Sequence, residues 1–290
     1  MLPAKRLKYS AVVDRPPLAL PGKARVVVWP VVNVEVWDIG RAMPRQGLPP
    51  PTGITQLPDV ANWGWHEYGM RVGFWRIKAL LDELKIVPSL SVNARVCLDY
   101  PRIARACRDG GWEFMGHSYD QRPMHSEPDP ASMIRRSVKV IREFTGKRPL
   151  GWMGPGLTET LETPEMLAAA GIQYTADWVV DDEPCTIRTR GGSLVTIPYT
   201  LELNDIAMMV VQRHPAREFE TRCMDQFARL YREGRERPKV MAIAVHPYIT
   251  GVPHRIQYFD NVFRRLRKQK GVLFWTGEQI YKWYIQSRKR

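Results

Sequence analysis

RVVVWPVVNVEVW, residues 25–37, is the stretch that decides the fold. Its apolar run is nearly continuous rather than alternating, which is typical of a strand buried on both faces. Later segments predict further strands at 86–92, 112–118, 172–177, 194–199, 240–248 and 272–275. Helical patterns separate them, and strands that alternate with helices predict parallel βαβ units. The alternation runs through the 290-residue chain without an internal linker, which predicts one (β/α) barrel.

Predicted helices fill the intervals between these strands. Apolar residues at helical spacing from Phe74 to Leu84 predict a helix over 67–84. Proline at the first helical position, after Asp129 and again after Thr163, marks the starts of two more helices. Further helices are predicted over 97–111, 216–233, 257–268 and 277–287.

Composition and charge exclude several classes of protein. Hydrophobic residues make up 44% of the chain, and no apolar run approaches the ~18 residues of a membrane-spanning helix. The net charge of +13 is concentrated at the ends, with +5 in residues 1–25 and +8 in residues 261–290. No nucleic-acid-reading motif accompanies this charge. These observations predict a protein that binds neither nucleic acid nor membrane. Because the four cysteines are scattered and the start lacks a signal-peptide pattern, we also expect the protein to be cytoplasmic.

Polar side chains stand where the predicted strands end, and the active site of a parallel barrel lies at those ends. Asn33 and Glu35 end the first strand, His117 and Asp120 follow the strand at 112–118, and His246 ends the strand at 240–248. A single histidine in such a place is more often structural. Two histidines with several carboxylates, at the ends of different strands, are what a hydrolytic centre needs.

The order of these segments resembles the polysaccharide deacetylase (NodB-like) superfamily. The similar motifs, first to fifth, are VVNVEVWD (31–38), GHSYDQ (116–121), GWMGPG (151–156), ADWVVDDEP (176–184) and VHPYITGVPHR (245–255). The resemblance spans residues 25 to 280. It implies an α/β fold, a distorted and incompletely closed (β/α)7 barrel that forms a single domain over 25–290 after a basic, Pro-rich arm at 1–24. The branch most similar contains metal-independent allantoinases and cyclic imide hydrolases.

The metal motif of the superfamily is changed in this chain. Metal-dependent members hold zinc or a similar ion with one Asp and an H-x-x-x-H pair. Here Gln121 stands four residues after His117, and Asn33 stands where an Asp would serve. The metal-independent allantoinases have similarly changed motifs, so no cofactor is expected. The alternative is a zinc-like divalent metal held by Glu35 and His117 with Asp120 or Gln121.

Amide hydrolysis needs an activated water, a donor for the oxyanion and an acid for the leaving nitrogen. A carboxylate such as Glu35 suits the water, and His246 suits the acid role because an ordinary histidine pKa, ~6.5, is close to operating pH. The predicted catalytic residues are Glu35, His117, Asp177 and His246. The predicted substrate-binding residues are Trp63, Trp65, Trp152, Gly154, Pro155, Trp178, Asp181 and Arg255. For the tryptophans, packing in the core is the competing interpretation.

The leading hypothesis is a hydrolase of a non-peptide carbon–nitrogen bond that opens a small cyclic amide, ureide or imide, such as allantoin or a succinimide-like ring. One alternative is a metal-assisted N-deacetylase of amino sugars or polysaccharide. The incomplete histidine pair and the lack of a signal peptide count against it. Another alternative is an inactive barrel that binds a sugar or a protein. Convergence of Glu35, His117 and His246 on one pocket would count against that reading.

Two segments are candidates for subunit contacts. These are the arm at 1–24 and the proline-rich, irregular segment 38–66, which includes Gly53. Irregular segments of that length are usually functional or disordered. The resemblance implies a tetramer, since relatives in this branch are tetrameric, and we expect a homo-oligomer, either a tetramer or a dimer, that binds a small-molecule amide or imide.

Overall fold

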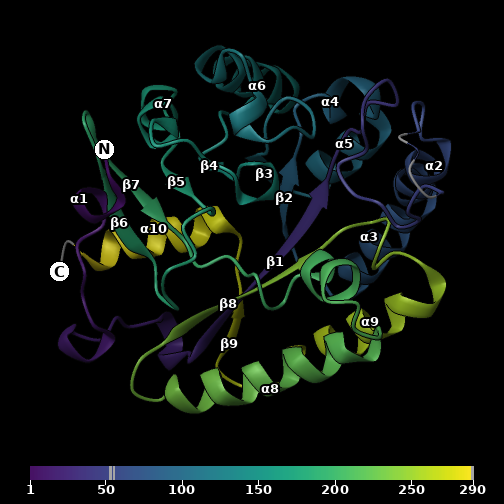
Figure 1. Ribbon diagram of the computed structural model, residues 1–290. Coiled ribbons are helices and arrows are strands. Elements are labelled where there is room, and N and C mark those ends of the chain that lie inside the picture. The colour runs from purple at the N-terminus through teal and green to yellow at the C-terminus, as the bar shows by residue number, and fades with distance from the viewer. Residues whose placement is uncertain (52–53, 55, 289–290) are drawn as a thin grey trace.

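The computed structural model of the chain describes residues 1–51, 54 and 56–288, so Gly53 and the last two residues of the predicted barrel domain lie outside the described residues. The centre is one curved sheet with helices packed around it (Figure 1). Its strands are β1 (Val26–Val34), β2 (Ser89–Val92), β3 (Glu113–Gly116), β4 (Gly151–Trp152), β5 (Tyr174–Thr175), β6 (Cys185–Thr189), β7 (Gly192–Thr196), β8 (Lys239–Val245) and β9 (Val272–Phe274).

The strand order is β6-β7-β5-β4-β3-β2-β1-β8, and β9 also pairs with β1. Within the described part of the chain, every pairing is parallel except the β6–β7 hairpin. Among the described residues, the two ends of the sheet, β6 and β8, do not pair with each other. Irregular chain covers the gap instead, where Ala244 N–H donates to Leu203 O at 3.0 Å. The predicted fold, an incompletely closed parallel (β/α) barrel, is confirmed.

The helices lie on the outside of the sheet, with α8 and α9 side by side along β8 (Figure 1). They are α1 (Pro3–Arg6), α2 (Val60–Tyr68), α3 (Phe74–Glu83), α4 (Val96–Asp99), α5 (Pro101–Asp109), α6 (Pro130–Thr145), α7 (Thr163–Ala169), α8 (Arg217–Glu233), α9 (Pro253–Arg267) and α10 (Gly277–Ser287). Single 3₁₀ turns occur at Val12–Asp14, Pro21–Lys23, Met124–Ser126 and Pro155–Leu157, and π-helical turns at Gly69–Gly73 and Ile206–Val211. In the described part of the chain, no helix is both long enough and apolar enough to cross a membrane.

Several predicted boundaries differ from the observed ones by a few residues; α9, for example, begins at Pro253 rather than at residue 257. The irregular segment predicted for 38–66 ends earlier, because α2 begins at Val60 with the Asp59 side chain accepting a hydrogen bond from Asn62 N–H. The strand predicted at 194–199 is the second arm of a hairpin whose first arm, β6, has no counterpart among the predicted strands. The β6 sequence CTIRT is short and only partly buried, so it carries no strong apolar pattern.

Strand β1 explains how the barrel positions its site. Its even-numbered valines pack in the core cluster shared with the outer helices, and Val27, Trp29 and Val31 pack in the inner cluster with Tyr174. Side chains of a strand alternate between faces, so the odd-numbered positions beyond Val31 continue the inner side. Asn33 and Glu35 are the next two of these positions, and they emerge at the C-terminal mouth of the barrel.

The N-terminal arm is fastened to the barrel at two arginines. The side chain of Arg6 is fully buried and donates to Arg188 O at 2.7 Å, to Leu161 O at 2.9 Å and to the Glu165 carboxylate at 3.0 Å. Arg15 pairs with Asp181 at 2.8 Å. The arm therefore packs on its own barrel over α7 and the β6–β7 region.

Candidate active site

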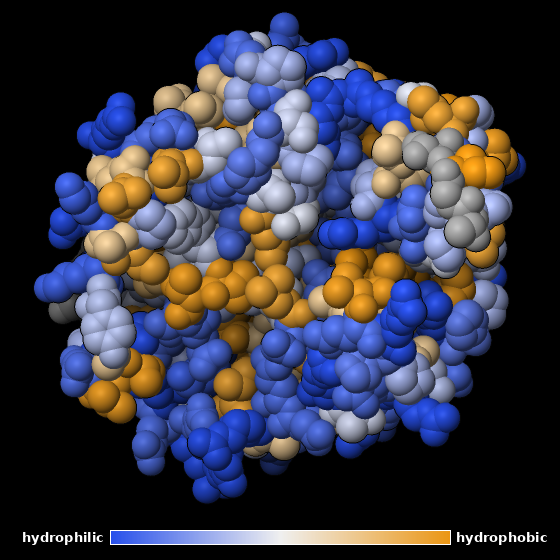
Figure 2. All heavy atoms as spheres, in the orientation of Figure 1, coloured by the Kyte–Doolittle hydropathy of each residue, from blue (hydrophilic) through white to orange (hydrophobic). Residues whose placement is uncertain are grey.

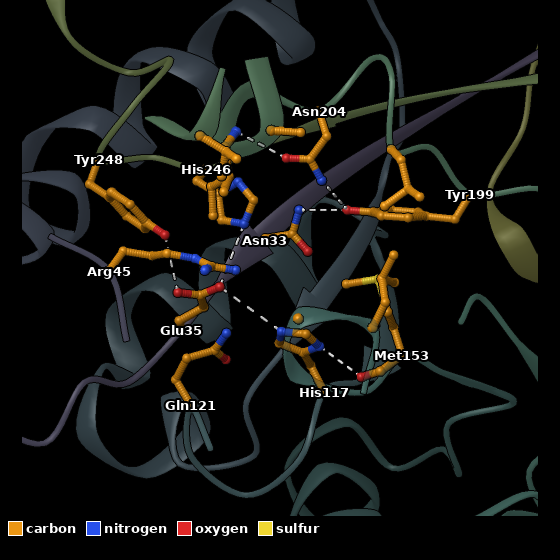
Figure 3. A pocket seen from close by; sticks show the side chains of 16 residues that line it. Asn33, Glu35, Arg45, His117, Gln121, Met153, Tyr199, Asn204, His246 and Tyr248 are labelled. Carbon is orange, nitrogen blue, oxygen red and sulfur yellow. Dashed lines mark hydrogen bonds and ion pairs between the residues drawn. The ribbon is translucent and has the colours of Figure 1, made fainter. Parts of the chain in front are cut away.

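A cavity of about 210 Å³ opens at the C-terminal ends of the strands. It brings together polar side chains from β1, β3, β8 and the segments after β7 (Figure 3). Those drawn and labelled are Asn33, Glu35, Arg45, His117, Gln121, Met153, Tyr199, Asn204, His246 and Tyr248. Leu201, Ile206 and Val211 line its apolar side. Figure 2 shows a band of apolar residues across the same face.

Glu35 is the buried carboxylate at the centre of the cavity. Its Oε2 accepts hydrogen bonds from Trp37 Nε1–H at 2.7 Å and from the Tyr248 hydroxyl at 3.3 Å. Its Oε1 lies 3.5 Å from His246 Nε2 and 4.0 Å from His117 Nε2. Burial alone raises the pKa of Glu35, but the contacts with both histidines and with Trp37 outweigh it and lower the pKa to about 2. Glu35 is therefore ionised and has little affinity for a proton.

His246 lies between two carboxylates. Its Nδ1–H donates to Asp205 Oδ1 at 2.6 Å, and its Nε2 faces Glu35. Asp205 Oδ2 also accepts the His246 backbone N–H at 2.7 Å and the Thr250 hydroxyl at 2.6 Å, which fixes the carboxylate. Burial lowers the pKa of His246, but Asp205 and then Glu35 reverse this and raise it to about 9. The ring is therefore an imidazolium near neutral pH.

His117 has the opposite protonation. Its Nδ1–H donates to Met153 O at 2.7 Å, so the neutral ring presents the Nε2 lone pair toward Glu35 and the cavity. Burial lowers the pKa of His117, and the negative charge of Glu35 opposes this shift only in part. One neutral histidine and one charged histidine thus face the same carboxylate, which is an arrangement suited to a general base and a general acid.

The sequence did not single out Asp205, Tyr199, Tyr248 or Arg45. Asp205 lies in LELND, an irregular segment whose pattern gives no strand end or helix face, and it approaches His246 only because this segment fills the gap in the barrel. Arg45 is half-buried, lines both the cavity and an adjoining cavity of about 420 Å³, and forms no ion pair with the described residues.

Asp177 does not line the cavity. Its carboxylate accepts the Gly154 N–H at 2.8 Å and the Thr175 hydroxyl at 3.0 Å, so it supports the turn after β4 from behind. Burial and the negative charge of Glu159 raise the pKa of Asp177 well above its usual range. Asp177 and Gly154, predicted respectively as catalytic and substrate-binding, contact each other rather than the open space.

The remaining predicted substrate-binding residues also lie outside the cavity lining. Trp152 is fully buried, and Pro155 is buried in the turn after β4. Trp178 donates to Glu159 at 2.8 Å. Asp181 pairs with Arg15 of the arm, and Arg255 donates to Ile249 O at 3.5 Å.

Trp63 and Trp65 are half-buried. They pack in an aromatic cluster with Trp37 and Tyr248, behind the cavity wall.

The predicted metal ligands do not assemble into a set. Asp120 turns toward Arg41 at 3.4 Å and lines the adjoining cavity instead. The Gln121 amide oxygen accepts a hydrogen bond from Asn93 at 3.2 Å, and an amide is a weak zinc ligand. Among the described residues, no group of three or more His, Cys, Asp or Glu side chains could hold a metal ion. The residues present therefore do not fit a bound zinc.

Comparisons with known proteins point to one superfamily. No family model matches the chain. It is 28% identical over 246 residues to a putative polysaccharide deacetylase of Schizosaccharomyces pombe, covering 74% of this chain and 73% of that protein. In three dimensions it is similar to the PuuE allantoinase, with a TM-score of 0.84, 24% identity and coverage of 95% and 96% of the two chains.

A second solved structure is similar to this chain over nearly its whole length. A probable polysaccharide deacetylase of Pseudomonas aeruginosa matches with a TM-score of 0.82 and 24% identity over 94% of this chain and 95% of that one. The chain thus resembles the polysaccharide deacetylase superfamily in sequence and in fold, as its motifs predict.

Proposed function

We propose that this chain opens a small cyclic amide, ureide or imide by hydrolysis. The observation that carries the proposal is the pair of buried histidines, His117 neutral and His246 charged, on either side of Glu35. Such a pair supplies a base and an acid at the same pH without a change of conformation. The similarity to the PuuE allantoinase supports this choice of substrate class.

The reaction uses the side chains as follows. His117 Nε2 takes a proton from water, and the water oxygen bonds to the ring carbonyl carbon to form a tetrahedral oxyanion. The carbon–nitrogen bond then breaks as His246 Nε2–H protonates the leaving nitrogen. The proton held by His117 returns to His246, and the products are a carboxylic acid and an amine or amide of the opened ring. Glu35 acts by orienting the two histidines and by keeping His246 charged, since its own pKa of about 2 makes it a weak base.

The size of the cavity favours a small ring. About 210 Å³ is below the ~300–1,000 Å³ typical of sites for drug-sized ligands. The chain's resemblance to polysaccharide deacetylases keeps the amino-sugar deacetylase as the second candidate. The predicted homo-oligomer and the predicted independence from cofactors stay predictions.

A turnover screen tests the proposal. The substrates are allantoin, hydantoin, dihydrouracil, succinimide and an N-acetylated chito-oligosaccharide, with metal analysis of the same preparation. We expect ring opening of at least one cyclic substrate, slowed about 10²–10⁴-fold by His117→Gln and retained in His125→Gln, because His125 is exposed and outside the cavity. Release of acetate from the oligosaccharide with no ring opened would establish the deacetylase, and inactivity on every substrate would favour the inactive binding barrel.

A further inference from the structure

Three polar side chains on one wall of the cavity are locked in a single orientation. Asn33 Nδ2 donates to Val245 O at 3.4 Å and to the Tyr199 hydroxyl oxygen at 3.2 Å. Asn204 Oδ1 accepts the Ile206 N–H at 3.0 Å, so its amide nitrogen must be the group that donates to Tyr199 at 3.4 Å. Backbone partners therefore decide which end of each amide faces the tyrosine.

This orientation leaves two groups without partners. The Tyr199 oxygen accepts two hydrogen bonds, and within the described residues its own hydrogen is donated to nothing. Asn33 Oδ1 is buried, and it too has no partner there. Burial raises the pKa of Tyr199, so the phenol keeps its hydrogen. A buried donor and a buried acceptor left unpaired cost stability unless a ligand or water satisfies them.

The two unpaired groups stand side by side and face the same space. The 3.2 Å bond between Asn33 Nδ2 and Tyr199 holds the amide next to the phenol. Figure 3 shows the Asn33 oxygen turned into the space that Tyr199, His117 and Glu35 surround. The wall therefore presents an acceptor beside a donor to whatever occupies the cavity.

We propose that Asn33 Oδ1 and the Tyr199 hydroxyl bind the N–H and the neighbouring C=O of an unsubstituted cis –NH–CO– edge. This inference rests on the proposed function and narrows its substrate class. In a small ring the amide is held cis, so its N–H and C=O project toward the same side and can reach both groups at once. N-substituted rings lack the required donor.

The same geometry disfavours an N-acetylated sugar. An acyclic secondary amide is trans. Its N–H and C=O lie in the amide plane but point to opposite sides of the C–N bond. Such a group can satisfy Asn33 or Tyr199 from one position, but it cannot satisfy both. The cis form of an acyclic amide is rare because it is much less stable than the trans form, whereas a small ring imposes the cis form.

Binding of three matched rings tests the inference on the unaltered protein. The ligands are succinimide, N-methylsuccinimide and 2-methylsuccinimide, and the readouts are Kd by calorimetry and kcat/KM for ring opening. N-methylation removes the donor, and we expect it to weaken binding about 10- to 100-fold. The 2-methyl ring has the same size and keeps its N–H, so it controls for steric exclusion and should bind like succinimide.

Each outcome has one meaning. Equal binding of the N-methyl ring would overturn the inference and leave the proposed function standing if rings are still opened. Discrimination in Kd without turnover would support the inference while the proposed function fails. Absence of binding by all three rings at millimolar concentration would overturn the inference, while the proposed function would stand if another ring of the turnover screen is opened.

Two variants assign the effect to the residues. In Asn33→Leu the preference for succinimide over its N-methyl form is expected to disappear. In Tyr199→Phe both rings should bind about tenfold more weakly, with the preference retained, since the carbonyl is common to both. Tyr281→Phe is the control, because this tyrosine lies on α10, away from the cavity. Melting temperatures measured on the same preparations separate loss of binding from loss of fold.

Discussion

Glu35 and His246 form a buried ion pair, with Oε1 and Nε2 3.5 Å apart, and Asp205 holds the same histidine from its other side. One imidazolium thus lies between two carboxylates, and the second carboxylate explains why its pKa rises in spite of burial. His117 has no such second partner, because its Nδ1 is bonded to the neutral Met153 carbonyl. The two histidines therefore differ in protonation state because their Nδ1 atoms have different partners, a carboxylate for His246 and a carbonyl for His117.

The activity should follow a bell-shaped pH profile in kcat/KM. His117 must be neutral to accept a proton, and its lowered pKa places the acid limb below ~6.5, the ordinary histidine value. His246 must be charged to donate one, and its pKa of about 9 places the alkaline limb there. The measurement is kcat/KM across pH 5 to 10 at constant ionic strength. A rate that keeps rising through the alkaline limb would show that His246 is not the acid.

Asp205→Asn should move the alkaline limb to lower pH. The charge of Asp205 makes the largest upward contribution to the pKa of His246, and the substitution removes that charge while the side chain keeps its shape. The acid limb, set by His117, should change little. Asp225→Asn is the matched control, because Asp225 is exposed on α8. An unchanged alkaline limb in Asp205→Asn would contradict the assignment.

The raised pKa of His246 also makes the stability of the folded protein depend on pH. A histidine whose pKa is raised on folding stabilises the folded state fully below its unfolded value, ~6.5, and this contribution is lost as the pH rises through the folded value, about 9. The melting temperature of the unaltered protein should therefore fall across pH 7 to 10. Asp205→Asn should be less stable at neutral pH and should show a smaller fall over that range.

Activity is expected to survive treatment with a chelator. Asp120 is bound to Arg41, and Gln121 replaces the histidine that would complete a zinc site, so the predicted ligands do not surround one point. The measurement is kcat before and after dialysis against a chelator, with metal content determined in parallel. Stoichiometric zinc, with activity lost on chelation and restored by zinc, would contradict this prediction.

Much of the fold was predictable because β1 is apolar on both faces and its odd-numbered positions lead to Asn33 and Glu35. His117 and His246 were predictable for the same reason, since each directly follows a buried strand. Asp205 was not, because the irregular segment that carries it is placed by the gap between the two ends of the sheet, β6 and β8, rather than by a pattern of its own. Trp152 was misleading because a large aromatic side chain at the end of a strand, here β4, packs inward as readily as it lines a pocket.

Arg6→Ala should destabilise the protein without changing its site. The buried guanidinium makes two hydrogen bonds to carbonyls and one ion pair with Glu165, and their loss is worth on the order of 2–3 kcal/mol. Lys5→Ala is the control, because Lys5 is exposed on the same turn. Thermal unfolding and kcat on one preparation provide the check. An unchanged melting temperature would show that the arm is not fastened by Arg6.

His117→Ala and His246→Ala should reduce kcat to a similar degree but differ in stability. A positioned acid or base contributes about 10²–10⁴-fold to rate, so each variant should lose that much. Removing His246 also leaves Glu35 and Asp205 buried without their shared cation, and buried carboxylates without a partner are strongly unfavourable. Removing His117 breaks one bond to a carbonyl and leaves the ion pair intact.

Melting temperature and kcat measured together separate the two roles. We expect a clear drop in melting temperature for His246→Ala, and a small one for His117→Ala, at neutral pH. His246→Ala loses stability because the cation that compensates Glu35 and Asp205 is removed. His246→Lys places another cation there, so it should recover part of the stability but not the acid function. A His246→Ala protein that is stable and nearly fully active would remove His246 from the mechanism.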